Sequence, residues 1–389
     1  MSALRRIAGV QAHLPAGRQA FGHIDWALFA AALSISLLGL VTMHSFSAEE
    51  AYFDRQIVWI GVSIGVFFIA SLPEYTFLRR TPVIVTLYSV VLFLLATIFM
   101  FGSIVKGAQN RFNLGFFFVQ PADPAKLILV VLLAKYFSRR HIEIAHFKHI
   151  AVSGAYAFAL FALVFLQPDF GSAIIIFSVW FGLVLVSGLS WKHLAALLIT
   201  GMVIAGALWH WGLHPYQKQR ILTFLHPLTD IQGTGYNAYQ STVAVGSGEL
   251  FGKGIGYGTQ SKLQFLPEYQ TDFIFAAYAE EWGFLGVVLI LGLFAVLIIR
   301  ILSFAVRGGD NFDSLFAAGI AIYFLAQFTV HVGMNMGLLP ITGTTLPFMS
   351  YGGSHLLTEY LTLGILMGLR RRVRPTLQAR DETEIVGAV

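Results

Sequence analysis

Residues 266–275 read Leu-Pro-Glu-Tyr-Gln-Thr-Asp-Phe-Ile-Phe and join a long polar segment to an apolar run that continues to about residue 302. The carboxylates Glu268 and Asp272 end the polar segment, and Glu280 and Glu281 follow within the apolar run. A carboxylate at the mouth of a membrane-spanning helix is costly to keep there, so it marks a candidate functional site. The alternative is that Asp272 only caps the helix.

The composition indicates a polytopic membrane protein. Of the 389 residues, 57% are hydrophobic and only 12% are charged, whereas soluble domains carry about 25% charged residues. The sequence contains no cysteine, which excludes disulfides, thiolate catalysis and cysteine metal sites. The net charge of +5 is small; we attribute it to basic inner loops and expect no nucleic-acid partner.

Apolar segments of spanning length predict an all-α fold with about ten transmembrane helices. The first of them is expected to remain as an anchor, since no cleavable signal peptide is evident. The predicted spans are residues 24–45, 55–72, 81–101, 121–137, 149–166, 169–188, 192–212, 272–302, 313–336 and 351–369.

The basic residues predict the orientation of these helices. Lys and Arg cluster in one set of loops, which the positive-inside rule places in the cytoplasm. Residues 1–23 and 370–389 are then cytoplasmic tails on either side of a single membrane domain, residues 24–369. Residues 213–271 form a large extracytoplasmic loop between the seventh and eighth helices, and a loop of this length is unusual unless it is functional.

Charged residues within the spans need partners or water. On one continuous helix Glu280 lies roughly 12 Å from Asp272 along the axis and about 80° around it, so both can face one site. Glu281 points to the opposite side, where a buried ion pair between helices is the structural interpretation. Lys126 begins the fourth span, and its candidate partners are Asp123, Glu280 or a lipid phosphate.

Two irregular segments interrupt the apolar pattern. Asp169 follows Gln167-Pro168 between the fifth and sixth spans, where capping of the next helix is the structural interpretation and an ion site is the alternative. Residues 339–354 are dense in Pro, Gly, Thr and Ser. Non-helical backbone at that depth must be buried in protein or line a cavity. No pair of histidines has metal-ligand spacing on a helix.

Over nearly its whole length the chain resembles the SEDS family of bacterial shape, elongation, division and sporulation proteins. The matching motifs are residues 266–275, Glu280-Glu281, residues 339–354, residues 216–221 and residues 252–254. Within the family, Gly-Thr-Gln-Ser at 258–261 and Gln-Pro-Asp at 167–169 resemble the RodA branch more than the FtsW branch.

The resemblance implies a ten-helix peptidoglycan glycosyltransferase that polymerises lipid II during cell elongation and maintenance of cell shape. Such enzymes act at the outer face of the bacterial cytoplasmic membrane, beside a class B penicillin-binding protein and other membrane proteins of the elongation complex. The family's essential loop aspartate corresponds to Asp272. The chain departs from the family at Phe112, where Trp is common, and at Ala122-Asp123, where Ser-Glu is common. The resemblance therefore assigns no detailed role to residues 106–123.

Glycosyl transfer from a polyprenyl pyrophosphate needs a base at the acceptor hydroxyl and positive charge at the leaving group. We expect Asp272 to be the catalytic base, oriented by Glu268. Two basic residues of the long loop, Arg220 and Lys253, are the candidates that meet the pyrophosphate. Lys218, Lys262 or a divalent cation such as Mg²⁺ or Mn²⁺ are the candidates for additional positive charge. The remaining substrate-binding candidates are Lys126, Glu280, Ser350 and Ser354.

Two other functions fit parts of the sequence. A flippase for the same lipid would place functional charges near the midplane, where Lys126, Glu280 and Glu281 could serve it. The long charged outer loop favours chemistry at one face instead. A non-catalytic scaffold for other wall enzymes is the third hypothesis, and it leaves the Asp272 carboxylate without a role.

Overall fold

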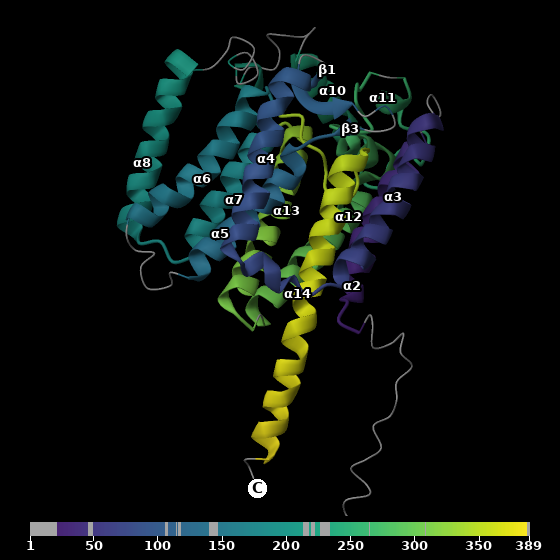
Figure 1. Ribbon diagram of the computed structural model, residues 1–389. Coiled ribbons are helices and arrows are strands. Elements are labelled where there is room, and N and C mark those ends of the chain that lie inside the picture. The colour runs from purple at the N-terminus through teal and green to yellow at the C-terminus, as the bar shows by residue number, and fades with distance from the viewer. Residues whose placement is uncertain are drawn as a thin grey trace, which may run out of the picture.

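The structure is a computed structural model of the chain. It describes residues 22–45, 50–105, 108–113, 115, 118–139, 147–212, 218, 222–225, 234–263, 265–307 and 309–386. Figure 1 shows a bundle of long helices, with short helices and strands at one end and the last part of α14 extending beyond the other. The end that carries α10, α11 and the strands is called the loop end below, and the opposite end is called the tail end.

Each predicted span corresponds to a long helix, and most boundaries agree within a few residues. The exception is the last helix, which continues to Val386 and so includes most of the predicted tail at residues 370–389. The long helices are α2 Trp26–His44, α3 Glu50–Ser71, α4 Thr81–Phe101, α5 Ala122–Ser138, α6 Phe147–Leu166, α7 Phe170–Val186, α8 Trp191–Ala207, α12 Ile274–Arg307, α13 Asn311–Asn335 and α14 Gly353–Val386. Within the described residues, seven helices are long and apolar enough to cross a membrane. The other three are α5 and α7, with 17 residues each, and α14, which is charged in its second half.

The segments between the long helices hold structure that the all-α prediction left out. Three short strands, β1 Ser103–Val105, β2 Ala108–Asn113 and β3 Phe118–Val119, form an antiparallel sheet in the order β1-β2-β3. The remaining elements are short helices: η2 Tyr75–Arg79, η3 Leu208–Gly212, α10 Thr234–Ser247 and α11 Thr259–Lys262.

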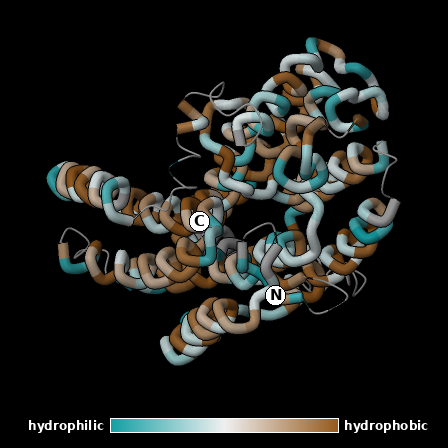
Figure 2. The backbone as a smooth tube through the Cα atoms, turned by 90° about the horizontal axis from the view of Figure 1, so that it is seen from above, coloured by the Kyte–Doolittle hydropathy of each residue, from teal (hydrophilic) through white to brown (hydrophobic). Residues whose placement is uncertain are grey.

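The centre of the bundle is formed by α5, α7 and α13, which pack against one another. Most residues of α5 and α13 are buried, whereas no residue of α8, all of which the structure describes, is buried. In Figure 1, α8 stands at the edge of the bundle, and Figure 2 shows hydrophobic residues recurring along the outer helices. This distribution fits helices that face lipid at the periphery and protein at the centre.

Helix α12 is broken at Gly283, which has φ 65° and ψ −165°, a conformation that only glycine adopts readily. Two carbonyls in the last turn of the first half accept hydrogen bonds from the backbone N–H groups of Lys253 and Gly254, at 2.9 and 3.0 Å. The first two N–H groups of the second half donate to the carbonyls of Glu249 and Leu250, at 2.8 and 3.1 Å. The same loop therefore satisfies backbone groups on both sides of the break.

The tail end is fastened by ion pairs with arginine. Asp25 caps α2 by accepting from Leu28 N, and it lies 2.7 Å from an Arg300 nitrogen and 2.8 Å from an Arg370 nitrogen. Burial alone would raise the pKa of Asp25, but the hydrogen bonds from Arg300 and Leu28 and the charges of Arg370 and Arg300 together hold it below its usual value. These pairs join α2, α12 and α14.

Candidate active site around Asp272

Asp272 lies in a tight turn two residues before α12 begins, with its side chain half-buried. The turn is closed by the carbonyl of Glu268, which accepts from the N–H groups of Thr271 and Phe273 at 3.0 and 3.2 Å. Glu268 itself has φ 53°, and its carboxylate accepts a hydrogen bond from the Thr271 hydroxyl at 3.3 Å. Glu268 therefore shapes the turn that presents Asp272.

The last residue of α13 holds this turn in place. The side-chain nitrogen of Asn335 donates to the carbonyl of Asp272 at 3.0 Å, and its side-chain oxygen accepts from the N–H of Ala276 at 3.2 Å. Ala276 belongs to the first turn of α12, where backbone N–H groups have no partner within the helix. Asn335 thus supplies part of the cap and fixes the backbone of Asp272 in the same contact.

The irregular segment after α13 forms the other side of the site. A Cβ built on Gly343 would lie 3.6 Å from Oδ2 of Asp272, and Gly343 has φ 74°, where L side chains are rare. His331 Nδ1 lies 2.8 Å from the Thr344 carbonyl. The Ser350 hydroxyl donates to the Thr271 carbonyl at 2.7 Å. Leu346, Phe348 and Met349 are fully buried, whereas Gly343 is exposed, so the second half of this segment is packed inside protein and its first half is more open.

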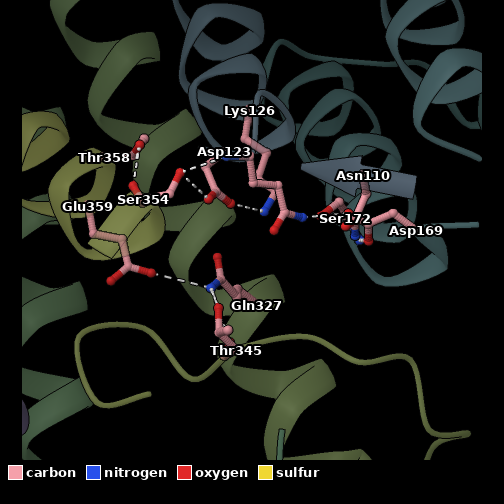
Figure 3. A network of polar contacts seen from close by, with 11 residues as sticks. Asn110, Asp123, Lys126, Asp169, Ser172, Gln327, Thr345, Ser354, Thr358 and Glu359 are labelled. Atoms are coloured by element: carbon pink, nitrogen blue, oxygen red, sulfur yellow. Dashed lines mark hydrogen bonds and ion pairs between the residues drawn. The ribbon is translucent and has the colours of Figure 1, made fainter. Parts of the chain in front are cut away.

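Lys126 and Asp123 form a buried ion pair at the start of α5, with 3.2 Å between Nζ and Oδ1. The second oxygen of Asp123 accepts from the Ser354 hydroxyl at 3.1 Å, and Ser354 in turn accepts from the N–H of Gln120 at 3.1 Å. Figure 3 shows this group of side chains, drawn from several helices. The structure thereby brings together two of the predicted residues, Lys126 and Ser354, and the expected pairing of Lys126 with an acid is confirmed.

Asp169 caps α7, because its Oδ1 accepts from the N–H of Ser172 at 3.0 Å. Its second oxygen accepts from the Gln120 side chain at 2.7 Å. The capping interpretation is therefore confirmed. Gln120 links this cap to Ser354, so the polar contacts run from the sheet side of the bundle to α14 (Figure 3).

Glu280 is fully buried and binds the loop that closes the break in α12. Its carboxylate accepts from Lys253 Nζ at 2.7 Å and from the N–H groups of Thr259 and Gln260, at 2.9 and 3.1 Å. It thereby holds the first turn of α11 and neutralises Lys253. In this structure the charge of Lys253 is compensated within the chain.

Glu281 binds the same loop as Glu280, and neutral donors take the place of the expected ion pair. One of its oxygens accepts from the Ser45 hydroxyl at 2.6 Å and from the N–H of Gly256 at 2.8 Å. Among the residues that the structure describes, no cation pairs with Glu281.

The other basic candidates from the long loop are Lys262, Lys218 and Arg220. Lys262 Nζ lies 3.5 Å from the carbonyl of Gly256, and Lys218 is half-buried. Arg220 lies outside the described residues. Within the described part of the chain, no group of three or more His, Asp or Glu side chains is arranged to hold a metal ion.

Three polar residues of α13 were not recognised in the sequence as site residues: Gln327, His331 and Asn335. Asn335 contacts Asp272, whereas His331 and Gln327 contact Thr344 and Thr345 in the irregular segment after α13. Their spacing of four residues within an apolar helix was the available signal, because such residues share one face of a helix.

The apolar helices and the half-buried carboxylate at the loop end define a multi-pass membrane protein with a polar site at one end of its helical bundle. The chain belongs to the FtsW/RodA/SpoVE family of cell cycle proteins, whose model matches residues 23–374. The peptidoglycan glycosyltransferase MrdB of Escherichia coli strain K12 is 34% identical over 349 residues, which are 89% of this chain and 93% of that protein. Stage V sporulation protein E of Bacillus subtilis is 33% identical, over 90% of this chain and 98% of that protein.

Solved structures agree with this assignment. A chain from a peptidoglycan synthase complex that coordinates polymerization and crosslinking has a TM-score of 0.77 and 32% identity, covering 90% of this chain and 98% of that one. The rod shape determining protein RodA of Thermus thermophilus has a TM-score of 0.67 and 30% identity, covering 89% and 96%. FtsW proteins are also similar to this chain, but the comparisons favour the RodA branch of the family. This agrees with the prediction made from residues 258–261 and 167–169.

Proposed function

We propose that this chain is a peptidoglycan glycosyltransferase that polymerises lipid II into glycan strands during cell elongation, with Asp272 as its catalytic base. The observation that carries the assignment of Asp272 is its position: a half-buried carboxylate on a turn fixed by Asn335 and Glu268, next to the bare backbone of Gly343. Gly343 has no side chain that could cover the carboxylate from that side.

The reaction joins a sugar hydroxyl to an anomeric carbon. Asp272 removes the hydroxyl proton as the oxygen attacks, and the bond from the anomeric carbon to the pyrophosphate oxygen breaks, releasing the polyprenyl pyrophosphate. Base assistance of this kind contributes on the order of 10²–10⁴-fold to the rate. At the end of the bundle, the carboxylate reaches a sugar in water while the lipid chain stays in the membrane.

Positive charge at the leaving group is the second requirement. Arg220 and Lys218 remain our candidates from the long loop, with Lys262 beside them in the same loop. Lys253 is already paired with Glu280, so it would contribute only by exchanging that partner for a phosphate. Lys126 and Ser354 are both bonded to Asp123, so they would contact the substrate only by exchanging that partner. No step is assigned to a metal ion.

The proposed setting is the bacterial cytoplasmic membrane, with both tails inside and residues 213–271 outside. The arginine ion pairs gathered at the tail end support this orientation. Because the chain has no cysteine, labelling of introduced cysteines tests it. Tyr257→Cys, at a 72% exposed position, should react only from outside, and Arg307→Cys only from the cytoplasm; the reverse pattern would invert the orientation.

The proposed partner is a class B penicillin-binding protein that crosslinks the new strands, together with other membrane proteins of the elongation complex. The similarity to a chain from a complex coordinating polymerization and crosslinking supports this. Co-purification of the tagged chain with its transpeptidase from cells tests the pairing.

The decisive experiment for the function uses purified protein in liposomes supplied with lipid II. The wild type should form glycan polymer, and Asp272→Asn should form almost none while it still folds and binds the transpeptidase. Glu268→Gln should have a milder effect, because Glu268 acts only by shaping the turn. Wild-type polymer yield from Asp272→Asn would refute the base assignment and favour the flippase or scaffold hypothesis.

A further inference from the structure

Helix α13 carries three buried polar residues on one face: Gln327, His331 and Asn335, each no more than 1% exposed. They are four residues apart, so they follow one another along the helix at intervals of about 6 Å. Buried polar groups are costly in a membrane protein unless they are hydrogen-bonded. The partners of these three residues therefore indicate what they do. We call this set the α13 polar row.

Asn335 binds the segment that carries the proposed base. Its side chain contacts the carbonyl of Asp272 and the N–H of Ala276, and its backbone carbonyl accepts from the Ser241 hydroxyl of α10 at 2.9 Å. It joins three separate pieces of the chain at one point. A change in this side chain would move Asp272 relative to α13.

His331, one turn earlier, binds the opposite side of the site. A carbonyl can only accept, so His331 Nδ1 carries the hydrogen that is donated to Thr344 at 2.8 Å. Among the described residues, no group bonds the second ring nitrogen, Nε2. The histidine is therefore held to the backbone next to Gly343 by a single hydrogen bond.

Gln327, one turn earlier again, binds the residue next to Thr344. Its side-chain nitrogen lies 3.1 Å from both the carbonyl and the hydroxyl of Thr345, and 3.3 Å from Oε1 of Glu359 on α14 (Figure 3). The other oxygen of Glu359 accepts from the N–H of Phe348 at 2.7 Å. The irregular segment is thus attached to α13 and α14 at successive residues.

From these contacts we infer that the α13 polar row sets the position of the Asp272 carboxylate relative to the backbone of residues 343–345. One rigid helix holds the base through Asn335 and the facing backbone through His331 and Gln327. The three residues are positioning residues, since they act through the segments they bind. The inference rests on the proposed function of Asp272, and it adds which residues align that group.

The consequence is a dependence of turnover on a hydrogen bond that does not touch the substrate. Displacing a catalytic group by about 1 Å can cost on the order of 100-fold in rate. Loss of the His331–Thr344 bond should therefore lower kcat more than it changes KM, because the groups that bind the lipid remain in place.

The test compares His331→Asn with His331→Leu in liposomes with lipid II. Asparagine retains an N–H donor close to the position of Nδ1, whereas leucine has similar bulk and no donor. We expect His331→Leu to lower kcat about 10- to 100-fold with KM within about threefold, and His331→Asn to recover most of the activity. His149→Leu is the matched control. His149 is a buried histidine of α6 whose Nδ1 lies 3.0 Å from the Tyr136 hydroxyl of α5, and loss of this hydrogen bond should leave kcat unchanged.

A second readout does not depend on activity. Amide hydrogen exchange of residues 340–346 should increase in His331→Leu and not in His331→Asn. Should His331→Leu fail to give a monodisperse protein, Gln327→Met, which removes the same kind of donor, carries the same expectation. Equal kcat for the leucine, asparagine and wild-type proteins would overturn the inference. If that result is found and Asp272→Asn is inactive, only the positioning role of the α13 polar row is refuted. If Asp272→Asn is active, the assignment of Asp272 as the catalytic base is refuted as well.

Discussion

The two ends of the bundle bind their buried acids in different ways. At the tail end, Asp25 is matched by Arg300 and Arg370, and Asp313 is matched by Arg79. At the loop end, Glu281 and Glu359 are bound by hydroxyl, amide and backbone N–H donors. Two acids are intermediate: Glu280 has one lysine and several N–H donors, and Asp123 has Lys126 and the Ser354 hydroxyl.

The difference shows which acids serve the fold alone. An acid surrounded by arginine is neutralised and fixed, and it joins helices with no capacity left for a substrate. Acids bound by neutral donors are held in place without a matching charge, which is the arrangement needed where substrate groups must be bound or deprotonated. On this basis we expect the tail end to stabilise the fold and the loop end to hold the proposed reaction site.

The strongest test of the comparison removes one carboxylate from each end. Asp272→Asn should lower polymer formation by about 10²–10⁴-fold with little change in melting temperature, because it removes the base and retains the size. Asp25→Asn should lower the melting temperature, by about 2–4 °C for a loss of about 1 kcal/mol, and leave turnover of the folded protein within about twofold. Thermal unfolding and polymer yield are measured on the same preparations. Equal loss of activity in both variants would mean that the two ends do not differ in this way.

A second test addresses the broken helix that supports the loop end. A Cβ on Gly283 would lie 2.2 Å from the nitrogen of Gly252, and backbone cannot yield that far. Gly283→Ala should therefore cost about 3 kcal/mol or more, from strain and displacement of the loop. Gly292→Ala is the control in the same helix: it meets nothing within 4 Å and should be neutral or slightly stabilising. Similar melting temperatures for both variants would contradict the need for the break.

The intermediate pair, Lys253 and Glu280, sharpens the comparison. Lys253→Met leaves the buried Glu280 without its cation and should cost about 1–3 kcal/mol, reduced by the partial exposure of Lys253. Adding Glu280→Gln should recover part of that loss. Activity of the double variant separates the two roles: if KM for lipid II stays normal, Lys253 is only structural, and if KM rises, Lys253 binds the pyrophosphate.

The smallest expected effect is the pH dependence of the tail end. The pKa of Asp25 is lower in the folded protein than its usual value of 3.8, so its contribution to stability is fully present above about pH 5 and is lost as the pH falls through the folded pKa. The melting temperature of the wild type should therefore fall more steeply below pH 4 than that of Asp25→Asn. Parallel curves would show that Asp25 does not contribute in this way.

Sequence reasoning located the long helices, because apolar length is a local property. It also predicted the pairing of Lys126 with an acid, and it singled out Asp272 as the candidate base, since both follow from a charge beside an apolar run. It missed the break at Gly283, because glycine within an apolar helix is common and the partners of this break lie some thirty residues earlier. The three short strands were missed because residues 103–119 are too short and irregular to show alternation.

The α13 polar row was missed for a different reason. A spacing of four residues is visible in the sequence, but what Gln327, His331 and Asn335 bind is not. Their partners lie in segments around residues 272 and 345, and only the packed bundle brings these together. Roles that depend on such distant contacts need the structure.

The interruption of α12 also bears on how the chain enters a membrane. After Gly283, residues 284–307 contain 24 residues, a length of roughly 36 Å, which is enough to cross a hydrocarbon layer of about 30 Å without the preceding half. Insertion machinery that reads this segment would meet no acid in it. Glu280 and Glu281 would be carried to the outer side with the preceding loop, and would be buried afterwards, when the bundle closes around the first half of the helix.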